Sequence, residues 1–175
     1  MAVNTGKLQM TVIKEIYQEH FGQFADLLAE IEVGKHFDSK NQEHIEWLKQ
    51  KIAVRFFEGT HFYGMFLEDG TPVALAGLLI NECLFGPNNS ELKDIGTFEQ
   101  FRRKGYGSQL LAHCEQVSRD NNVYCMYMCT YVKEYYNIAF YGKNGFVPVA
   151  CLPDIHGPDD EGQVYMRKRL MERGE

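Results

Sequence analysis

The chain has 175 residues, of which 45% are hydrophobic and 24% charged, and its formal net charge is −6. These values are typical of a soluble globular protein with one sizeable core, so we expect a single domain over residues 1–175. The negative charge argues against a general nucleic-acid binder, whose surface must be basic to contact phosphates. It is compatible with a cationic acceptor such as an amine.

The sequence holds five cysteines, spread through apolar segments: Cys83, Cys114, Cys125, Cys129 and Cys151. An odd, dispersed set indicates reduced thiols in a cytoplasmic protein rather than a disulfide framework. The spacing of Cys and His residues does not match a zinc finger, so we expect no metal. The first nine residues lack an apolar signal segment. No apolar run approaches the roughly 18 residues that span a bilayer, so we expect no membrane partner.

Apolar periodicity predicts the elements of the N-terminal half. In chain order they are a strand at Met10–Ile13, helices over about Gln18–Glu32 and Ile45–Phe56, and strands at His61–Leu67, Pro72–Ile80 and Leu92–Phe98. Gly59 is placed to end the second helix. Asp69-Gly70, between two strands, is a strong hairpin signal and predicts an antiparallel pair.

In the C-terminal half the predicted elements are a helix at Tyr106–Arg119, a strand at Val123–Tyr131, a short helix at Tyr135–Lys143, and strands at Phe146–Ala150 and Val164–Lys168. The strand Val123–Tyr131 is apolar nearly throughout, which predicts burial on both faces. The strand–helix–strand unit from Leu92 to Tyr131 implies a parallel pair with a right-handed crossover. The whole order predicts an α/β fold with a mixed sheet of about seven strands and about four helices.

One stretch between a predicted strand and a predicted helix has the composition of an anion site: Phe101-Arg102-Arg103-Lys104-Gly105-Tyr106-Gly107-Ser108. A helix N-terminus has unpaired amides and a partial positive charge. Gly105 and Gly107 can adopt positive φ and let backbone approach a phosphate, while the three cations and Ser108 can add donors. A turn with a solvated basic face remains the alternative. The stretch lacks the ending of a P-loop and the third glycine of a dinucleotide fingerprint.

Two segments carry a family resemblance. Arg102-x-x-Gly105-x-Gly107 fits an Arg/Gln-x-x-Gly-x-Gly/Ala signature, and Tyr141 to Phe146 resembles a Tyr-x-Lys-x-Gly-Phe segment. Both belong to the GNAT superfamily of N-acetyltransferases, whose element order also matches over about Met10–Leu170. The chain therefore resembles that superfamily, and the resemblance implies the acyl-CoA N-acyltransferase fold.

By this resemblance, the chain transfers an acetyl group from acetyl-CoA to a primary amine of a small molecule or peptide, by direct attack on the thioester in a ternary complex. Tyr141 is the implied general acid for the leaving thiolate. Glu91 and Asp94 are candidates for the base, and solvated strand-edge charges are the alternative for both. The residues implied to contact acetyl-CoA are Thr97, Phe98, Arg102, Arg103, Lys104, Gly105, Tyr106, Gly107, Ser108, Asn137 and Tyr141.

The sequence departs from the family pattern at three positions. Glu99 stands where Pro is common, Glu134 where Asn is common and Asn137 where Ala is common. A catalytically silent acyl-CoA-binding sensor or interaction domain is the alternative function. Many family members dimerise, often through their terminal strands, and a homodimer is compatible with this sequence.

The acceptor cannot be named from the sequence. Candidate acceptor contacts are Glu32, His36 and Asp38, and an acidic loop with Asp154, Asp159, Asp160 and Glu161. Solvated loop charges are the favoured interpretation of both groups. We expect His113 to lie on the surface and Cys129 to be a buried structural thiol. Three aromatic residues of the short C-terminal helix are expected to be core residues: Tyr135, Tyr136 and Phe140.

Overall fold

The structure is a computed structural model that describes residues 9–33, 41–81, 86–155, 157–158 and 161–171. Its helices are η1 (Gln18–Phe24), α1 (Ala25–Val33), α2 (Gln42–Phe57), η3 (Glu99–Phe101), α3 (Tyr106–Asp120) and α4 (Tyr135–Lys143), where η marks a 3₁₀ helix. Its strands are β1 (Thr11–Ile16), β2 (His61–Leu67), β3 (Pro72–Ile80), β4 (Asn89–Thr97), β5 (Cys125–Tyr131), β6 (Val147–Leu152) and β7 (Gln163–Arg169).

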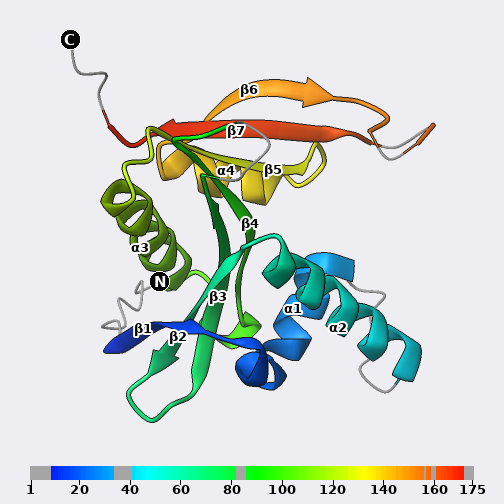
Figure 1. The fold of residues 1–175 in the computed structure, drawn as a ribbon, viewed down its shortest axis with the longest axis vertical. Coiled ribbons are helices and arrows are strands. Elements are labelled where there is room, and N and C mark those ends of the chain that lie inside the picture. Colours follow the sequence, from blue (N-terminus) through cyan, green and yellow to red (C-terminus); the bar gives the residue numbers. More distant parts are fainter. Residues whose placement is uncertain (1–8, 34–40, 82–85, 156, 159–160, 172–175) are drawn as a thin grey trace, which may run out of the picture. The chain divides into compact units, whose positions relative to one another are not determined.

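The seven strands form a mixed sheet in the order β1-β2-β3-β4-β5-β7-β6 (Figure 1). The β4–β5 pair is parallel, and β7 is antiparallel to both β5 and β6. The predicted fold class is therefore confirmed, and β2, β3 and α4 have the predicted bounds. None of the helices in the described ranges is long and apolar enough to cross a membrane.

The chain divides into two compact units, each treated separately below. The first contains Met1–Leu78 and Asp94–Cys114, and the second contains Leu79–Lys93 and Glu115–Glu175. β3, β4 and α3 therefore contribute one segment to each unit. The single domain expected over residues 1–175 stays a prediction.

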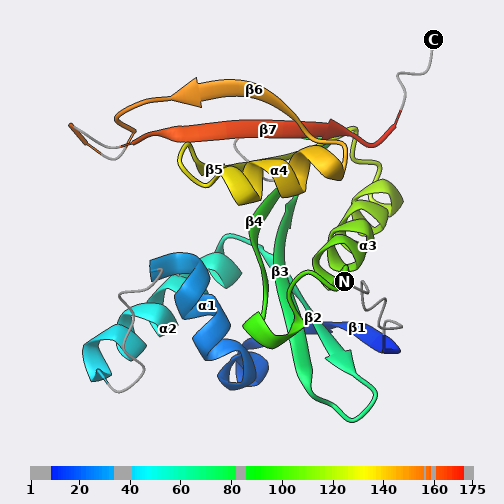
Figure 2. The ribbon, with the colours of Figure 1, turned by 180° about the vertical axis from the view of Figure 1, so that it is seen from behind.

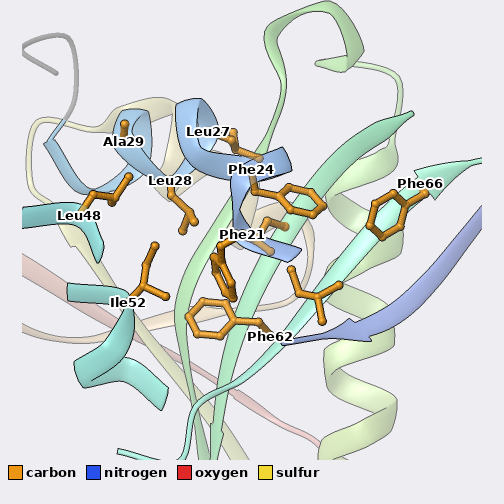
Figure 3. Close-up of a cluster of buried hydrophobic side chains, with 11 residues drawn as sticks. Phe21, Phe24, Leu27, Leu28, Ala29, Leu48, Ile52, Phe62 and Phe66 are labelled. Carbon is orange, nitrogen blue, oxygen red and sulfur yellow. The ribbon is translucent and has the colours of Figure 1, made fainter. Parts of the chain in front are cut away.

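An aromatic cluster forms the core of the first unit (Figure 3). Phe21 meets Phe62 edge-on, with 4.9 Å between ring centroids, and Phe24 meets Phe66 at 5.5 Å. The 3₁₀ turn η1 carries Phe21 and Phe24, so the predicted first helix is divided into η1 and α1. β4 lies close to α1, because a Cβ on Gly96 would stand 2.6 Å from Ile31 Cδ1.

Polar contacts join the C-terminal part of α3 to the strands of the second unit. Figure 2 shows these elements from behind. Buried Ser118 donates a hydrogen bond to Ser90 of β4 over 3.0 Å. Lys168 of β7 contacts the Glu115 carboxylate at 2.6 Å, and Arg119 contacts it at 3.2 Å. Because Glu115 is only 6% exposed, these two cations compensate a buried charge.

Only one face of β5 is fully covered. Met126, Met128 and Thr130 are buried, whereas Tyr127 and Cys129 on the alternate face are partly exposed and Tyr131 is 40% exposed. The prediction of burial on both faces is therefore right at the start of the strand, where Cys125 is 1% exposed, and wrong from Tyr127 onward. In this unit α3 and α4 contact the face of Lys168 and Thr130, so apolar composition alone did not reveal the open face.

The aromatic residues of α4 also differ from expectation. Tyr135 and Tyr136 are 71% and 93% exposed, so they are not core residues. Phe140 is partly buried and meets Tyr141 edge-on. A short helix has one buried stripe, and Tyr141 occupies it here.

Replacing Phe24 with alanine tests the aromatic core. Phe24 is 0% exposed, so Phe24→Ala should lower the free energy of unfolding by about 3–5 kcal/mol, measured by urea denaturation. Phe57, 94% exposed, is the matched control, and Phe57→Ala should change stability by less than about 0.5 kcal/mol. Equal losses in the two variants would contradict this description of the core.

Candidate functional site

The start of α3 presents a row of backbone amides that have no partner. Within the described residues, no acceptor is found for the amides from Arg103 to Ser108. The amides on either side are bonded: Arg102 N donates to Glu99 O at 3.2 Å, and Gln109 N donates to Gly105 O at 3.1 Å. Unpaired amides at the positive end of a helix bind anions. The loop predicted to bind an anion therefore has the backbone that this role needs.

The turn into α3 uses positive φ at two residues. Gly105 has φ 91° and Arg103 has φ 59°. Gly107 lies inside the first turn of α3 and needs no such conformation. Gly105 therefore uses the positive φ that glycine allows, whereas Gly107 does not, because it lies inside α3, which begins at Tyr106 as predicted.

Two of the three loop cations hold the loop itself. Arg102 donates from Nε to the Thr97 carbonyl at 2.9 Å and pairs with Glu30 of α1. Lys104 donates from Nζ to the Gln100 carbonyl at 2.8 Å. The positive charges of Arg102 and Lys104 remain near the amides, but their side-chain donors fix the shape of the loop. The sequence signature does not distinguish such donors from ligand-binding ones.

Tyr106 and Ser108 differ in environment. The Tyr106 ring is 2% exposed, and its hydroxyl accepts from Gln9 N at 3.3 Å. Tyr106 therefore offers the site its backbone amide, while its side chain belongs to the core. Ser108 is partly exposed in the first turn of α3.

At the end of β4, one backbone amide faces the outer edge of the strand, by which we mean the edge away from β3. Phe98 N donates to Val73 O of β3 at 3.0 Å, and Phe98 O accepts from Phe101 N at 2.8 Å. Alternate residues of a strand bond to opposite sides, so the Thr97 amide faces the edge of β4 away from β3. Both backbone groups of Phe98 are engaged within the protein, which leaves Thr97 as the candidate edge group.

The two candidate bases have opposite surroundings. Three positions apart on β4, Glu91 and Asp94 point to opposite faces. Asp94 is 5% exposed, with Arg55 Nε 3.7 Å from its carboxylate. Glu91 is partly exposed, lies beside Tyr127 of β5 and pairs with Lys93 at 3.0 Å.

Tyr141 and Asn137 both lie on α4. Tyr141 is 7% exposed, and Phe146 packs edge-on against its ring with 5.7 Å between centroids. Exposed Asn137 donates to the Glu134 carboxylate at 2.8 Å, and Thr130 donates to the same carboxylate. Glu134, a departure from the family pattern, thus holds Asn137 in place.

His113 is partly buried rather than on the surface. Its ring lies 4.9 Å from the Tyr63 ring, and burial lowers the His113 pKa. Burial, followed by the charge of Glu15, raises the pKa of Tyr63 to about 12. Both groups are therefore neutral near pH 7 and act as packing residues of the first unit.

Sequence reasoning missed a polar face in the second unit. Tyr127, Tyr165 and Arg167 are partly exposed on the same face as Glu91. Tyr165 is the register partner of Cys129. Burial raises the Tyr165 pKa, and electrostatic interaction with Cys129 and Glu91 raises it further. Cys129 is partly exposed rather than buried. The alternation of side chains between the two faces of β5 and β7 was the sequence signal that could have revealed this face.

Several acceptor candidates lie outside the described residues: His36, Asp38, Asp159 and Asp160. Glu161 pairs with Lys133 at 3.4 Å. A pocket of about 250 Å³ on α2 is lined by Trp47, Gln50, Lys51, Val54 and Arg55. It contains no predicted site residue. The described residues hold no group of three or more His, Cys, Asp or Glu side chains able to bind a metal.

Comparison with known proteins identifies a family. The sequence model of the acetyltransferase (GNAT) family matches residues 14–146. A search among curated proteins found no match. The structure is similar to that of the ribosomal-protein-S18-alanine N-acetyltransferase from Escherichia coli, with TM-score 0.74 and 17% identity over 95% of this chain and 97% of that one.

Two similar structures were solved with coenzyme A. A Bacillus subtilis acetyltransferase in complex with CoA has TM-score 0.71 and 18% identity, over 93% of this chain and 100% of that one. The PaiA N-acetyltransferase from Thermoplasma acidophilum, in complex with coenzyme A, has TM-score 0.67 and 19% identity, over 92% and 99%. At these identities the likeness shows the fold.

The turn at Gly105 can be tested through stability. A Cβ at φ 91° is strained, so Gly105→Ala should lower the free energy of unfolding by about 1–2 kcal/mol. Gly142 of α4 is the control, because a Cβ there meets nothing within 4 Å and should stabilise the helix by about 0.5–1 kcal/mol. Thermal or urea unfolding measures both variants. A Gly105→Ala protein as stable as the parent would refute the left-handed turn.

Proposed function

The chain belongs to the acetyltransferase (GNAT) family, and we propose that it transfers an acetyl group from acetyl-CoA to a primary amine of a small molecule or peptide. The row of unpartnered amides at the start of α3 carries this proposal, because it suits a pyrophosphate. The charge of −6 and the absence of a spanning helix in the described ranges are compatible with a cytoplasmic enzyme that needs neither nucleic acid nor membrane.

We assign the pyrophosphate to the amides from Arg103 to Ser108, with Arg102 and Lys104 holding the loop and adding positive charge. The Thr97 amide, on the outer edge of β4, would pair with a pantetheine carbonyl as an added strand does. The neighbouring Phe98 would fix the direction of the protein backbone at the end of β4, because both of its backbone groups are bonded within the protein. Asn137, held by Glu134, is a further proposed contact.

Acetyl-CoA supplies the thioester whose carbonyl carbon receives the amine. The amine nitrogen bonds to that carbon as the carbon–sulfur bond breaks. We propose that Glu91 takes the proton released from nitrogen, directly or through a water, and that the Tyr141 hydroxyl gives its proton to sulfur. Tyr141 is on α4, which contacts the covered face of β5, and Glu91 is on the open face, so the proposed thioester position lies between the strands beyond Glu91, where the β4–β5 register ends.

Glu91 suits the role of base better than Asp94. Asp94 is buried against Arg55 in the first unit, where an amine would have to displace packed groups. Glu91 lies on the open face of β5, and a substrate ammonium can take the place of the Lys93 ammonium that Glu91 now holds. Asp94 then serves as the partner of Arg55.

A homodimer is proposed through β6. All six residues of this strand are exposed, and β6 stands at the end of the sheet order. An edge strand with unpaired backbone groups can pair with a second copy.

Isothermal titration with acetyl-CoA tests the donor. We expect binding of acetyl-CoA and desulfo-CoA, weaker binding of S-acetylpantetheine because it lacks the pyrophosphate, and no comparable binding of ATP. A protein that binds no CoA species refutes the proposed function. Equal affinity for S-acetylpantetheine and acetyl-CoA would remove the pyrophosphate assignment of the α3 loop.

Tyr141→Phe tests the general acid. Losing the proton donor should lower kcat by about 10²- to 10⁴-fold while acetyl-CoA affinity stays within about twofold. Tyr136, 93% exposed on the same helix, provides the control Tyr136→Phe, which should leave kcat unchanged. Thiol release over a panel of amines measures kcat. Acetyl-CoA binding without transfer to any amine would favour the silent acyl-CoA-binding domain instead.

A further inference from the structure

Three residues form a row across the strands of the second unit. Glu91 of β4 is the register partner of Tyr127 on β5, and Tyr127 is the partner of Arg167 on β7. Register partners point to the same face of a sheet. A carboxylate, an aromatic ring and a guanidinium therefore stand side by side, two strand spacings apart from end to end.

This face is accessible. Tyr127, Arg167 and Glu91 are each partly exposed, whereas Met126 and Met166, on the other face of β5 and β7, are buried. Lys93 and Tyr165 extend the face along the strand direction. The helices of this unit contact the opposite face, through Lys168 and Thr130.

One hydrogen-bond donor of Arg167 has no acceptor among the described residues. Its Nε is buried, yet no acceptor for this atom exists among the described residues. A buried donor without a partner is costly, and a buried donor of a charged group is costlier. Arg167 as a whole is partly exposed, so an anionic group on the open face can bind its guanidinium once the side chain turns Nε toward that face.

The charges on this face also favour an anionic ligand. Glu91 is the one carboxylate of the row and already holds Lys93 at 3.0 Å. Arg167 therefore adds a second cation to a single anion, and the face carries a positive excess. The favoured complement is a ligand with a negative group, although the chain as a whole has a charge of −6.

We propose that this face, defined by Glu91, Tyr127 and Arg167, binds an acceptor that carries both an amine and a carboxylate. The inference rests on the proposed function. Arg167 binds the carboxylate, Glu91 receives the amine and its proton, and the Tyr127 ring supports the carbon atoms between them. Adjacent strands lie about 4.8 Å apart, so the Cα atoms of Glu91 and Arg167 are roughly 10 Å apart and their long side chains can converge over Tyr127.

That spacing sets the ligand class. Two side chains reaching inward from about 10 Å leave a gap of only a few bonds, which suits an amino acid or a short peptide with a free carboxylate. A polyamine would place a second ammonium against Arg167. Like charges at this distance disfavour binding.

The first test uses the unaltered protein with matched acceptors. Amino acids are compared with their carboxamides, which keep the amine and the size but lose the negative charge, and with a polyamine. A charged hydrogen bond to Arg167 predicts a kcat/KM at least about tenfold higher for the acids. Equal values, or a preference for carboxamides or the polyamine, would overturn the acceptor class and leave the acetyltransferase function standing. Transfer to no amine at all would overturn both.

The second test uses variants. Arg167→Met should raise KM for the carboxylate acceptor about 10- to 100-fold with KM for acetyl-CoA unchanged, and should abolish the preference over the carboxamide. Arg167→Lys should restore part of that preference, because it restores the charge. Arg169, exposed two positions along β7, provides the control Arg169→Met, which should alter neither KM. If Arg167→Met keeps the preference, or raises both KM values equally, the assignment of Arg167 is wrong.

Discussion

Backbone amides at the start of α3 have no acceptor among the residues that the structure describes, and the neighbouring residues fix the loop around that row. Gly105 supplies the left-handed turn that begins the helix, and Arg102 binds the Thr97 carbonyl and Glu30 so that the loop keeps its course. Two of the loop's cations thus act mainly as supports. If the loop binds the pyrophosphate as proposed, its fixed shape lowers the entropic cost of binding, because no flexible side chains need to be ordered first.

The second constraint is that the helices of the second unit cover one face of its strands. Ser118, Glu115 and Lys168 join α3 to β4 and β7 through buried polar contacts. The covered face is consequently apolar or charge-compensated, and the other face is free to carry polar groups. Because side chains alternate along a strand, the residues that pack the core also determine which neighbours lie on the open face. The register of β5 and β7 therefore determines both which residues pack the core and which polar side chains stand side by side on the open face.

Sequence patterns predicted the fold well because strand and helix periods, glycine stops and the hairpin at Asp69-Gly70 are local signals. They also predicted the strand–loop–helix arrangement around Gly105, because the glycine turn and the start of the helix are local signals; its role in binding stays a prediction. They did not show that Arg102 would bind Thr97 and Glu30, or that β5 would stay open on the face of Tyr127. The pairing with Glu30 and the cover over β5 depend on partners distant in sequence, and the bond to Thr97 depends on the path of the loop. Apolar residues such as Tyr and Cys suit both buried and partly exposed positions, so composition could not separate the two faces.

The acidic character of the chain favours a cationic acceptor, whereas the positive excess beside Arg167 favours an acceptor with a negative group. Local charge should decide affinity, because at physiological ionic strength a charge is screened beyond about 8 Å, whereas Arg167 would touch the ligand. The overall charge of −6 then acts only on the approach of ligands and not on their selection. A carboxylate near the base also has a chemical consequence. Once Arg167 neutralises the negative end of the acceptor, the amine no longer has that carboxylate as a counter-charge, so its proton is lost to Glu91 more readily. Recognition of the carboxylate and activation of the amine would then be two effects of one row of side chains.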